Sequence, residues 1–250
     1  MDRSIYTALN SMQILRTNQS VTSQNLANSS STGFQKDIST NFASVYLDRS
    51  KGLDPRVMAL QDASGFDSSQ GPKNPTGAPL DVALDGEGYF LVKPENGNIA
   101  LSRRGDFKVS ADGLFTDGTG TAMLNVDLEV MTIPPHRKIS IAADGTIEIE
   151  PLNAPIGQKL KIGQLATVSG SEVPLTKSED GFVRTVNGSV PEPDNKTSLL
   201  IGFLEGSNVK TVDELVSGIE QSRAYEINVK FVTTAKEIDE ATASLMRMPS

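Results

Sequence analysis

The amino-acid sequence predicts an α+β protein in which an N-terminal and a C-terminal helix pair as an α-helical coiled-coil domain, with a central, mainly antiparallel β domain between them. Neither residues 1–32 nor residues 219–248 contain Gly or Pro, and both stretches repeat apolar residues at helical spacing. The middle of the chain instead has short alternating runs separated by Asp-Gly pairs, as in β-hairpins. We therefore expect a discontinuous helical domain of residues 1–36 and 209–250, an extended connector of residues 37–79, and a β domain of residues 80–208.

The N-terminal helix is predicted from apolar residues that recur every three or four positions. This stripe consists of Ile5, Ala8, Met12 and Leu15, and its rhythm continues to Thr22 and Leu26. Asp2 is a candidate N-cap, and the run 29–33 ends the pattern. Because Gln19 and Thr22 make the stripe partly polar, the helix is expected to be marginal by itself.

The C-terminal helix is predicted to open with a capping box of Thr211 and Glu214. Its main apolar stripe has heptad spacing and consists of Ala224, Ile227, Phe231, Thr234, Ile238, Ala241, Leu245 and Met248. A second stripe of Tyr225, Val229 and Val232 lies on an adjoining face. An amphipathic helix lying on its own domain is the alternative, but the heptad spacing and the two apolar faces favour a coiled coil. We expect the N-terminal helix to cover one face and another chain to cover the second.

The middle of the sequence predicts short antiparallel strands. The clearest hairpin joins the alternating runs 139–141 and 147–149 through the turn Asp144-Gly145. Before these strands, residues 50–79 are rich in Gly, Pro and Ser, which is typical of an extended connector.

The composition argues against several classes of function. A net charge of -8 without a basic stripe argues against nucleic acid as a partner. The absence of Cys excludes disulfides and thiolate metal sites, and we find no stretch long enough for a membrane span. Because no secretory signal is visible either, sequence rules alone indicate a soluble cytoplasmic protein.

No constellation of catalytic residues is visible in the sequence. His136 is the only histidine, and it follows Pro134 and Pro135 in an expected surface turn, without partners for a hydrolytic triad or a zinc site. We therefore predict no enzymatic activity, no cofactor, no metal and no small-molecule substrate.

Segments near both ends of the chain resemble a known family. The run NLANSSSTGFQKD at residues 25–37 is similar to a signature shared by flagellar rod and hook proteins. LEGSNVKTVDELVSGIEQSRAYEINVK at residues 204–230 resembles the C-terminal signature of the same family, and residues 79–92 and 102–120 resemble its β-domain segments. The matching positions are Asn25, Asn28, Gly33, Phe34, Glu205, Ser207, Asn208, Tyr225 and Glu226. Gln35 departs from the family, where a basic residue is common.

This resemblance implies a structural subunit of the bacterial flagellar basal-body rod, most similar to the proximal-rod members of the family. Such a subunit leaves the cytoplasm through the flagellar type III export apparatus, which overrules the cytoplasmic default. It then polymerises helically in the periplasm with copies of itself and other rod proteins, as part of a torque-transmitting drive shaft. The alternatives are a distal-rod or hook subunit, and a secreted monomeric β-domain binding module whose ends resist proteases.

The resemblance and the stripes together predict a subunit interface made by the end helices. Its residues are Ile5, Ala8, Met12, Leu15 and Leu26 in the first helix and Ala224, Ile227, Phe231, Ile238 and Leu245 in the last. We expect both ends to be largely disordered in the free chain and to fold on assembly. Gly33 and Phe34 are candidates for a hinge after the first helix, with an ordinary helix C-terminus as the alternative.

Overall fold

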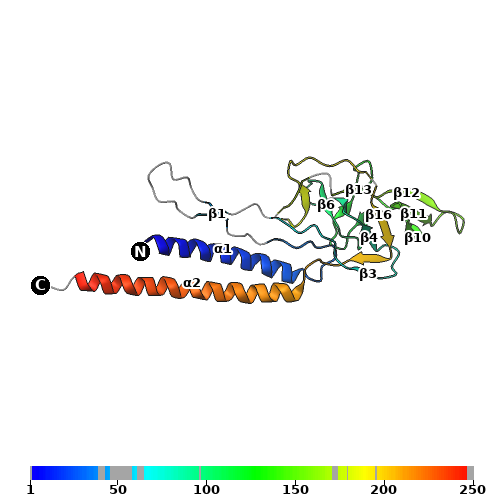
Figure 1. Cartoon of the computed structure of the whole chain (residues 1–250). Helices are drawn as coiled ribbons and strands as arrows, with labels where there is room; N and C mark the ends of the chain where they lie inside the picture. The colour runs from blue at the N-terminus through cyan, green and yellow to red at the C-terminus, as the bar shows by residue number, and fades with distance from the viewer. Residues whose placement is uncertain are drawn as a thin grey trace. The chain divides into compact units, whose positions relative to one another are not determined.

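The computed structural model describes residues 2–38, 43–45, 58–60, 65–95, 97–170, 174–178, 180–194 and 196–246. The chain divides into two compact units, which are described one at a time (Figure 1). The helical unit comprises residues 1–27, 37–65 and 210–250, and the β unit comprises residues 28–36 and 66–209. Much of the connector predicted at 37–79 lies outside the described residues.

The helical unit is built on two long helices, α1 (Asp2–Ala27) and α2 (Thr211–Met246). They run antiparallel, because Asn25 near the end of α1 lies beside Glu214 in the first turn of α2, whereas Ser11 lies beside Asn228 (Figure 1). A short hairpin of β1 (Ala43–Val45) and β2 (Met58–Leu60) belongs to the same unit. The prediction that the two ends of the chain are helical and pair with each other is confirmed.

The N-terminus of α2 differs in detail from the predicted capping box. The helix begins at Thr211, but its first hydrogen bond runs from the Glu214 N–H to the Lys210 carbonyl (3.1 Å), so Lys210 occupies the N-cap position. The prediction that Thr211 is the cap residue is therefore wrong. Asp213 and Glu214 lie in the first turn, where negative charge is favourable.

The face of α2 that packs on α1 is not its main apolar stripe. Instead, the seam is formed by the buried and half-buried residues Glu214, Gly218, Gln221, Tyr225, Asn228, Val232 and Ala235. Gln221 donates a hydrogen bond to the Thr22 hydroxyl (3.1 Å), and a Cβ on Gly218 would lie 3.7 Å from the Thr22 methyl group. The polar positions that interrupt the predicted stripe of α1 are therefore accommodated by polar partners across the seam.

The β unit contains the other strands. They are β3 (Lys73–Pro75), β4 (Val82–Asp85), β5 (Gly88–Lys93), β6 (Ala100–Ser102), β7 (Lys108–Val109), β8 (Phe115–Thr116), β9 (Ala122–Met123), β10 (His136–Ile141), β11 (Thr146–Pro151), β12 (Leu160–Gln164), β13 (Thr167–Ser169), β14 (Leu175–Lys177), β15 (Val183–Thr185), β16 (Ser198–Ile201) and β17 (Phe203–Glu205). The pairings described between these strands are antiparallel, as predicted.

The largest sheet has eight strands, in the order β14-β15-β6-β5-β9-β8-β7, with β13 also pairing with β5. Strands β10, β11 and β12 form a separate sheet, and β4 with β16 and β3 with β17 form two-stranded sheets. Both faces of β5 are covered, since Phe90 and Val92 belong to one hydrophobic cluster and Tyr89 and Leu91 to another. Burial on both faces explains why this strand is a continuous apolar run in the sequence.

The hairpin predicted around Asp144 and Gly145 is confirmed. β10 pairs with β11 so that Ile139 lies opposite Ile149, and Gly145 has a φ of 82°, which glycine adopts without strain. Asp144 accepts hydrogen bonds from the Thr146 N–H and hydroxyl, and these bonds lower the pKa of the Asp144 carboxyl. The turn is thus fixed by both the glycine conformation and the carboxylate.

Phe115→Ala is expected to destabilise the β unit strongly. The Phe115 side chain is fully buried, and its ring centroid lies 5.2 Å from that of Phe107. The substitution leaves a cavity, so the free energy of unfolding of the full chain should fall by about 3–5 kcal/mol in urea titrations followed by circular dichroism. Val186→Ala, at an exposed site, is the control and should change it by less than about 0.5 kcal/mol. Equal effects of the two substitutions would contradict this assignment of the core.

Candidate functional site

A buried ion pair between Arg103 and Glu205 lies at the centre of the candidate site in the β unit. Arg103 directly follows β6 and Glu205 ends β17. The Arg103 Nη2 atom is 2.8 Å from Glu205 Oε2, and neither side chain is more than 2% exposed. Arg103 also donates to the carbonyls of Gly88 (2.8 Å) and Gly86 (3.1 Å). Each guanidinium nitrogen therefore has a partner, as the burial of a charge requires.

Gly33 lies directly against this ion pair. Its N–H donates to the Glu205 carbonyl (2.8 Å), and its φ of 65° is in the left-handed region. A Cβ at this position would lie 2.5 Å from the Arg103 carbonyl carbon, which is closer than any side chain tolerates. Glycine is thus required here both by the backbone conformation and by the close approach to Arg103. This geometry describes a fixed turn at Gly33.

Phe34 and Gln35 continue the contact with the β unit. Lys177 of β14 lies 4.0 Å above the centre of the Phe34 ring and donates to the Gln35 carbonyl (2.9 Å). Gln35 is buried and accepts a hydrogen bond from the Tyr89 hydroxyl (3.1 Å), while its amide donates to the Ser68 carbonyl (3.2 Å). Burial raises the pKa of Tyr89, so its hydroxyl stays protonated and able to donate. The uncharged Gln35 suits this position because a buried lysine or arginine would need a carboxylate partner.

Asn208 connects the C-terminal segment to the same region. Its Oδ1 atom accepts from the Lys36 N–H (2.7 Å), and its amide donates to the carbonyls of Asp67 (2.9 Å) and Ser69 (3.0 Å). Ser207 is buried, and its hydroxyl accepts from the Val209 N–H (3.2 Å). The segments 33–36, 66–71 and 205–209 are therefore bound to one another around the ion pair. We call these segments, together with Arg103, the junction.

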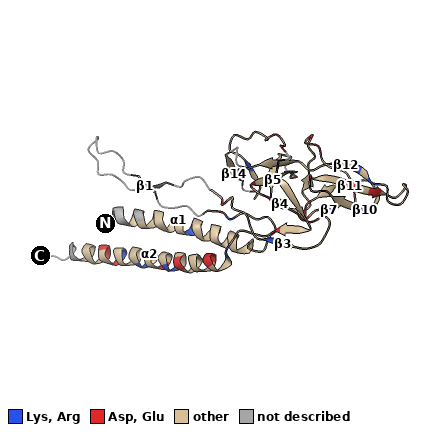
Figure 2. Ribbon diagram, turned by 45° about the vertical axis from the view of Figure 1, so that its right-hand side comes forward, with Lys and Arg blue, Asp and Glu red and all other residues tan. Residues whose placement is uncertain are grey.

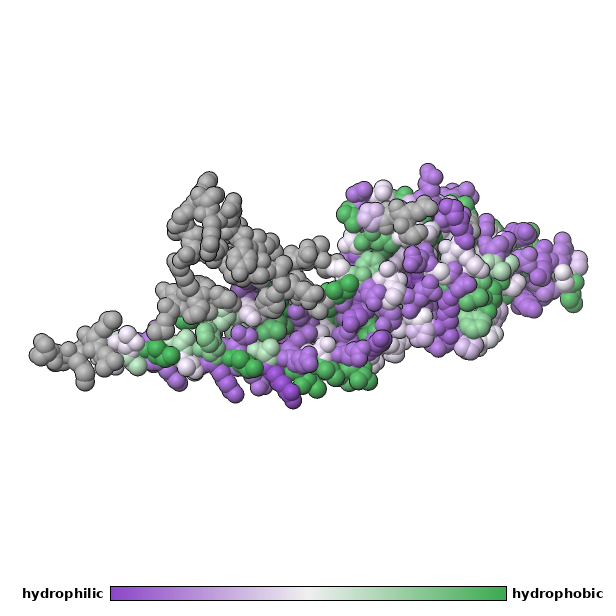
Figure 3. Space-filling view, viewed as in Figure 1, coloured by the Kyte–Doolittle hydropathy of each residue, from purple (hydrophilic) through white to green (hydrophobic). Residues whose placement is uncertain are grey.

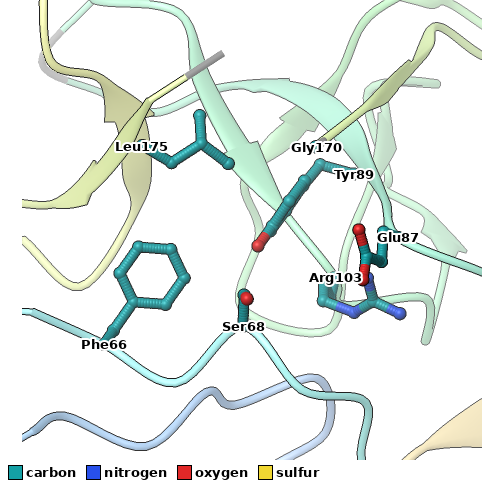
Figure 4. A pocket seen from close by; sticks show the side chains of 7 residues that line it. All are labelled: Phe66, Ser68, Glu87, Tyr89, Arg103, Gly170 and Leu175. Carbon is teal, nitrogen blue, oxygen red and sulfur yellow. The ribbon is translucent and has the colours of Figure 1, made fainter. Parts of the chain in front are cut away.

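A hollow of about 200 Å³ lies beside the junction (Figure 4). Phe66 and Leu175 lie on one side of it, and Glu87 and Arg103 on the other, with the Tyr89 side chain between them. Arg103 and Tyr89 are already bonded to Glu205 and Gln35. Among the described residues, no group of His, Cys, Asp and Glu side chains could hold a metal ion. In the described part of the chain, the lining of the hollow therefore shows no evident catalytic arrangement.

The helical unit presents a different kind of surface. Ile227 of α2 is 67% exposed, and Phe231 and Ile238 are each 46% exposed. Further toward the start of the helix, Val212, Val216 and Ile219 are also exposed. Figure 3 shows hydrophobic residues along the visible face of α2. A helix normally turns such residues toward its core, so an exposed stripe of this length is a candidate contact surface.

The other predicted interface residues have mixed environments. Ala8 and Leu15 of α1 are buried within the chain, whereas Ile5, Met12, Leu26 and Ala224 are half-buried. The side chain of Leu245 lies outside the described residues. The apolar stripe of α1 is therefore buried or half-buried within the chain, whereas Ile227, Phe231 and Ile238 of α2 are exposed.

The remaining motif residues have local structural roles or surface positions. Asn25 is buried, and its side chain exchanges two hydrogen bonds with the Asp37 backbone (both 2.9 Å). Asn28 accepts from the Ser31 hydroxyl in the turn after α1 (3.1 Å). Tyr225 is half-buried on the seam, whereas Glu226 is exposed.

The sequence did not predict the roles of Arg103, Tyr89, Lys177 and Gln35 in and around the junction. Arg103 and Glu205 are 102 positions apart, and no local pattern indicates that they meet. The available signal was weak, because Ala100, Leu101 and Phe107 are buried close to Arg103 in the sequence but Ser102, Arg104 and Asp106 beside it are polar. A charge in such a segment must either reach solvent or find a partner.

Comparison with known proteins identifies similar sequences over the whole chain. Residues 83–149 match a family model described as the flagellar hook protein FlgE/F/G D1 domain, and residues 201–245 match the flagellar basal body rod FlgEFG protein C-terminal model. The chain is 30% identical to the flagellar basal-body rod protein FlgF of Salmonella typhimurium, over 99% of this chain and 100% of that protein. It is 28% identical to FlgF of Escherichia coli over 95% of both chains. It is also 28% identical to the rod protein FlgG of Bacillus subtilis, over 99% of this chain and 100% of that protein.

Arg103→Met is expected to lower the free energy of unfolding by about 3–5 kcal/mol, because it leaves the Glu205 carboxylate buried without its partner. The adjacent Arg104 provides a matched control. Arg104 pairs with Asp106 at a partly exposed site, so Arg104→Met should cost at most about 1 kcal/mol. Chemical denaturation of the full chain measures both values. Similar losses of unfolding free energy at the two sites would show that the buried pair contributes no more to stability than the partly exposed one.

Gly33→Ala tests the turn independently of any charge. The left-handed backbone alone costs a non-glycine residue about 1–2 kcal/mol, and the contact with the Arg103 backbone adds to that cost. The midpoint of thermal unfolding should therefore fall clearly. Gly181→Ala is the control, since its φ of 82° carries the same strain but its Cβ would meet nothing within 4 Å. If the two variants lose the same stability, the contact between Gly33 and Arg103 contributes nothing.

Proposed function

The chain belongs to the flagellar basal-body rod protein family, and on that premise we propose that its exposed α2 stripe is the surface through which it packs into the rod. As a FlgF-like member, the protein is a structural subunit of the basal-body rod, and membership in this non-enzymatic family implies assembly with rod subunits. Family membership also decides against a secreted monomeric binding module. None of the described helices is long and apolar enough to cross a membrane.

The observation that carries the proposal is the exposure of large apolar side chains on α2. Ile227, Phe231 and Ile238 lie outside the seam with α1 and are open to solvent in the single chain. Burying each of them against a neighbouring subunit adds roughly 1.5–3 kcal/mol. Repeated around a helical assembly, these contacts stabilise the rod without any single strong bond. Ile5, Met12, Leu26, Ala224 and Leu245 are proposed to contribute at the edges of the same interface.

The polar character of the seam supports this division between intrachain and interchain contacts. Thr22 meets Gln221, and Ser11 meets Asn228, so the pairing of α1 with α2 is held partly by hydrogen bonds. Polar pairs at such positions specify which residues lie opposite one another but stabilise a helix pair less than apolar ones. We propose that the end helices are only marginally stable in the free chain and become stably folded when a neighbouring subunit buries the exposed α2 stripe.

The position of the subunit within the flagellum is part of the proposal. Two of the relatives reported above carry the name FlgF, which supports our proposal that the subunit lies in the proximal part of the rod, as the resemblance in the sequence implies. We propose that the subunit passes through the flagellar type III export apparatus and joins copies of itself and other rod proteins in the periplasm. Isolated basal bodies, sheared free of hook and filament, provide the test by mass spectrometry. The chain should remain with the rod fraction, whereas its recovery with the hook would move the assignment to another member of the family.

Phe231→Asp is expected to reduce incorporation into basal bodies by at least about tenfold, since a carboxylate replaces an apolar side chain in the proposed interface. The substitution lies at an exposed site, so the secondary structure and unfolding midpoint of the purified chain should stay close to those of the wild type. Thr233→Asp introduces the same charge at an exposed position of α2 outside the stripe, and should incorporate normally. Normal incorporation of Phe231→Asp would refute the α2 interface.

A further inference from the structure

Polar residues recur once per heptad on the packing faces of both long helices. They are Ser11, Asn18 and Asn25 in α1 and Glu214, Gln221 and Asn228 in α2. All of these side chains are buried or half-buried. Residues seven positions apart lie on one face of a helix in a coiled coil, so each helix presents a column of polar side chains to the other. We call these residues the α1 column and the α2 column.

Hydrogen bonds join the two columns at separate levels of the seam. The Asn25 amide donates to Glu214 Oε2 (3.5 Å), and the Asn228 amide donates to the Ser11 hydroxyl (3.5 Å). The bond that Gln221 donates across the seam lies between these two levels. The α1 column and the α2 column therefore face each other along the seam.

The polar columns lower the stability of the helix pair. The Oε1 atom of Gln221 is buried and has no hydrogen-bond partner in the described part of the chain. Leaving such an acceptor unpaired is unfavourable, and an apolar residue at the same position would avoid this cost. Ion pairs offer little alternative means of orienting α1, because Arg16 is the only charged residue between residues 4 and 27 (Figure 2). The columns therefore suit a role in selecting one packing arrangement better than a role in stability.

α2 offers a second and more apolar face on which α1 could pack. This face is the exposed stripe of Ile227, Phe231 and Ile238. At ~3.6 residues per turn, the stripe lies roughly 110° around α2 from the seam. If α1 packed on the stripe, Ser11 and Asn18 would lie against large apolar side chains without hydrogen-bond partners, which is unfavourable. The same packing would also bury the stripe within the chain.

We propose that the α1 column selects the seam face of α2 and thereby keeps the exposed stripe open. Ser11 and Asn18 are on this view specificity-determining residues, which prevent α1 from covering the stripe of its own chain. Polar residues at core positions of coiled coils specify one pairing at a cost in stability, as the columns do here. The choice of face is a property of the single chain. Its benefit rests on the proposed function, in which a neighbouring subunit covers the stripe.

Disulfide formation in the purified full chain reports which face α1 contacts, because the natural chain contains no Cys. Ala8→Cys with Val232→Cys reports the seam. These two positions lie two heptads from Thr22 and Gly218, where a Cβ on Gly218 would be 3.7 Å from the Thr22 methyl group. Ala8→Cys with Thr234→Cys reports packing on the stripe. With the natural α1 column, oxidation should favour the Val232 pair, since residues on different faces of α2 do not both meet the geometry of a disulfide.

Ser11→Leu together with Asn18→Leu removes the α1 column at two levels. The Asn25 side chain is kept, because it also bonds to the Asp37 backbone. The yield of the Thr234 disulfide relative to the Val232 disulfide should rise at least about tenfold, since two apolar side chains can now be buried against the stripe. Ser20→Leu together with Ser23→Leu adds apolar residues at exposed positions of α1, and should leave the ratio unchanged.

The inference is overturned if the Ser11→Leu, Asn18→Leu chain keeps the disulfide ratio of the natural column, or if it loses helical circular dichroism without gaining the Thr234 disulfide. Incorporation into basal bodies, measured for the same chain without the cysteines, separates this inference from the proposed function. A tenfold or larger loss of incorporation together with the new disulfide supports both. If the new disulfide forms and incorporation stays normal, the selection of the seam face stands and the role of the stripe in assembly fails.

Discussion

The structure of the β unit depends on one fully buried ion pair. Removing Arg103 and Glu205 from water is costly, and this cost is offset only because their charges are paired and their polar atoms are hydrogen-bonded. A pair of apolar residues could fill the same space with similar stability, so stability alone does not account for the presence of a charged pair at this buried site. The hydrogen bonds of a guanidinium are directional, and they fix the strand ends of β6 and β17 to the β4–β5 turn. The ion pair thus fixes the backbone geometry where the chain enters the β unit near Gly33 and leaves it near Asn208.

The two helices distribute their apolar residues in an unusual way. The seam between α1 and α2 contains Gln221 and Asn228, whereas Ile227 and Phe231 of the same helix are exposed. A chain selected for stability as a monomer would place the larger apolar groups in its own core. The arrangement agrees with the proposal that these apolar groups are buried only on assembly, against neighbouring subunits.

Local patterns in the sequence predicted the architecture well but did not predict the contacts that organise it. The hairpin at Asp144-Gly145 and both helices follow from the local spacing of apolar residues in the sequence, and they form where expected. The choice of seam on α2 did not follow, because two stripes compete and the decision is made by polar partners on α1. The pairing of Arg103 with Glu205 was equally hidden, since it joins strands that are distant in the sequence. The motif residues Gly33 and Asn208 were identified by resemblance, and only the structure supplies their physical reasons.

The junction fixes chain segments at the points where they enter and leave the β unit. The chain crosses between the two units after residues 27, 36, 65 and 209. Within the β unit, the Gly33 N–H donates to the Glu205 carbonyl, and the Lys36 N–H donates to the Asn208 side chain. The entering segment that contains Gly33 and the leaving segment that contains Asn208 are therefore bonded to each other. Because the Glu205 side chain also pairs with Arg103, displacing either segment breaks hydrogen bonds of the other and disturbs the buried ion pair.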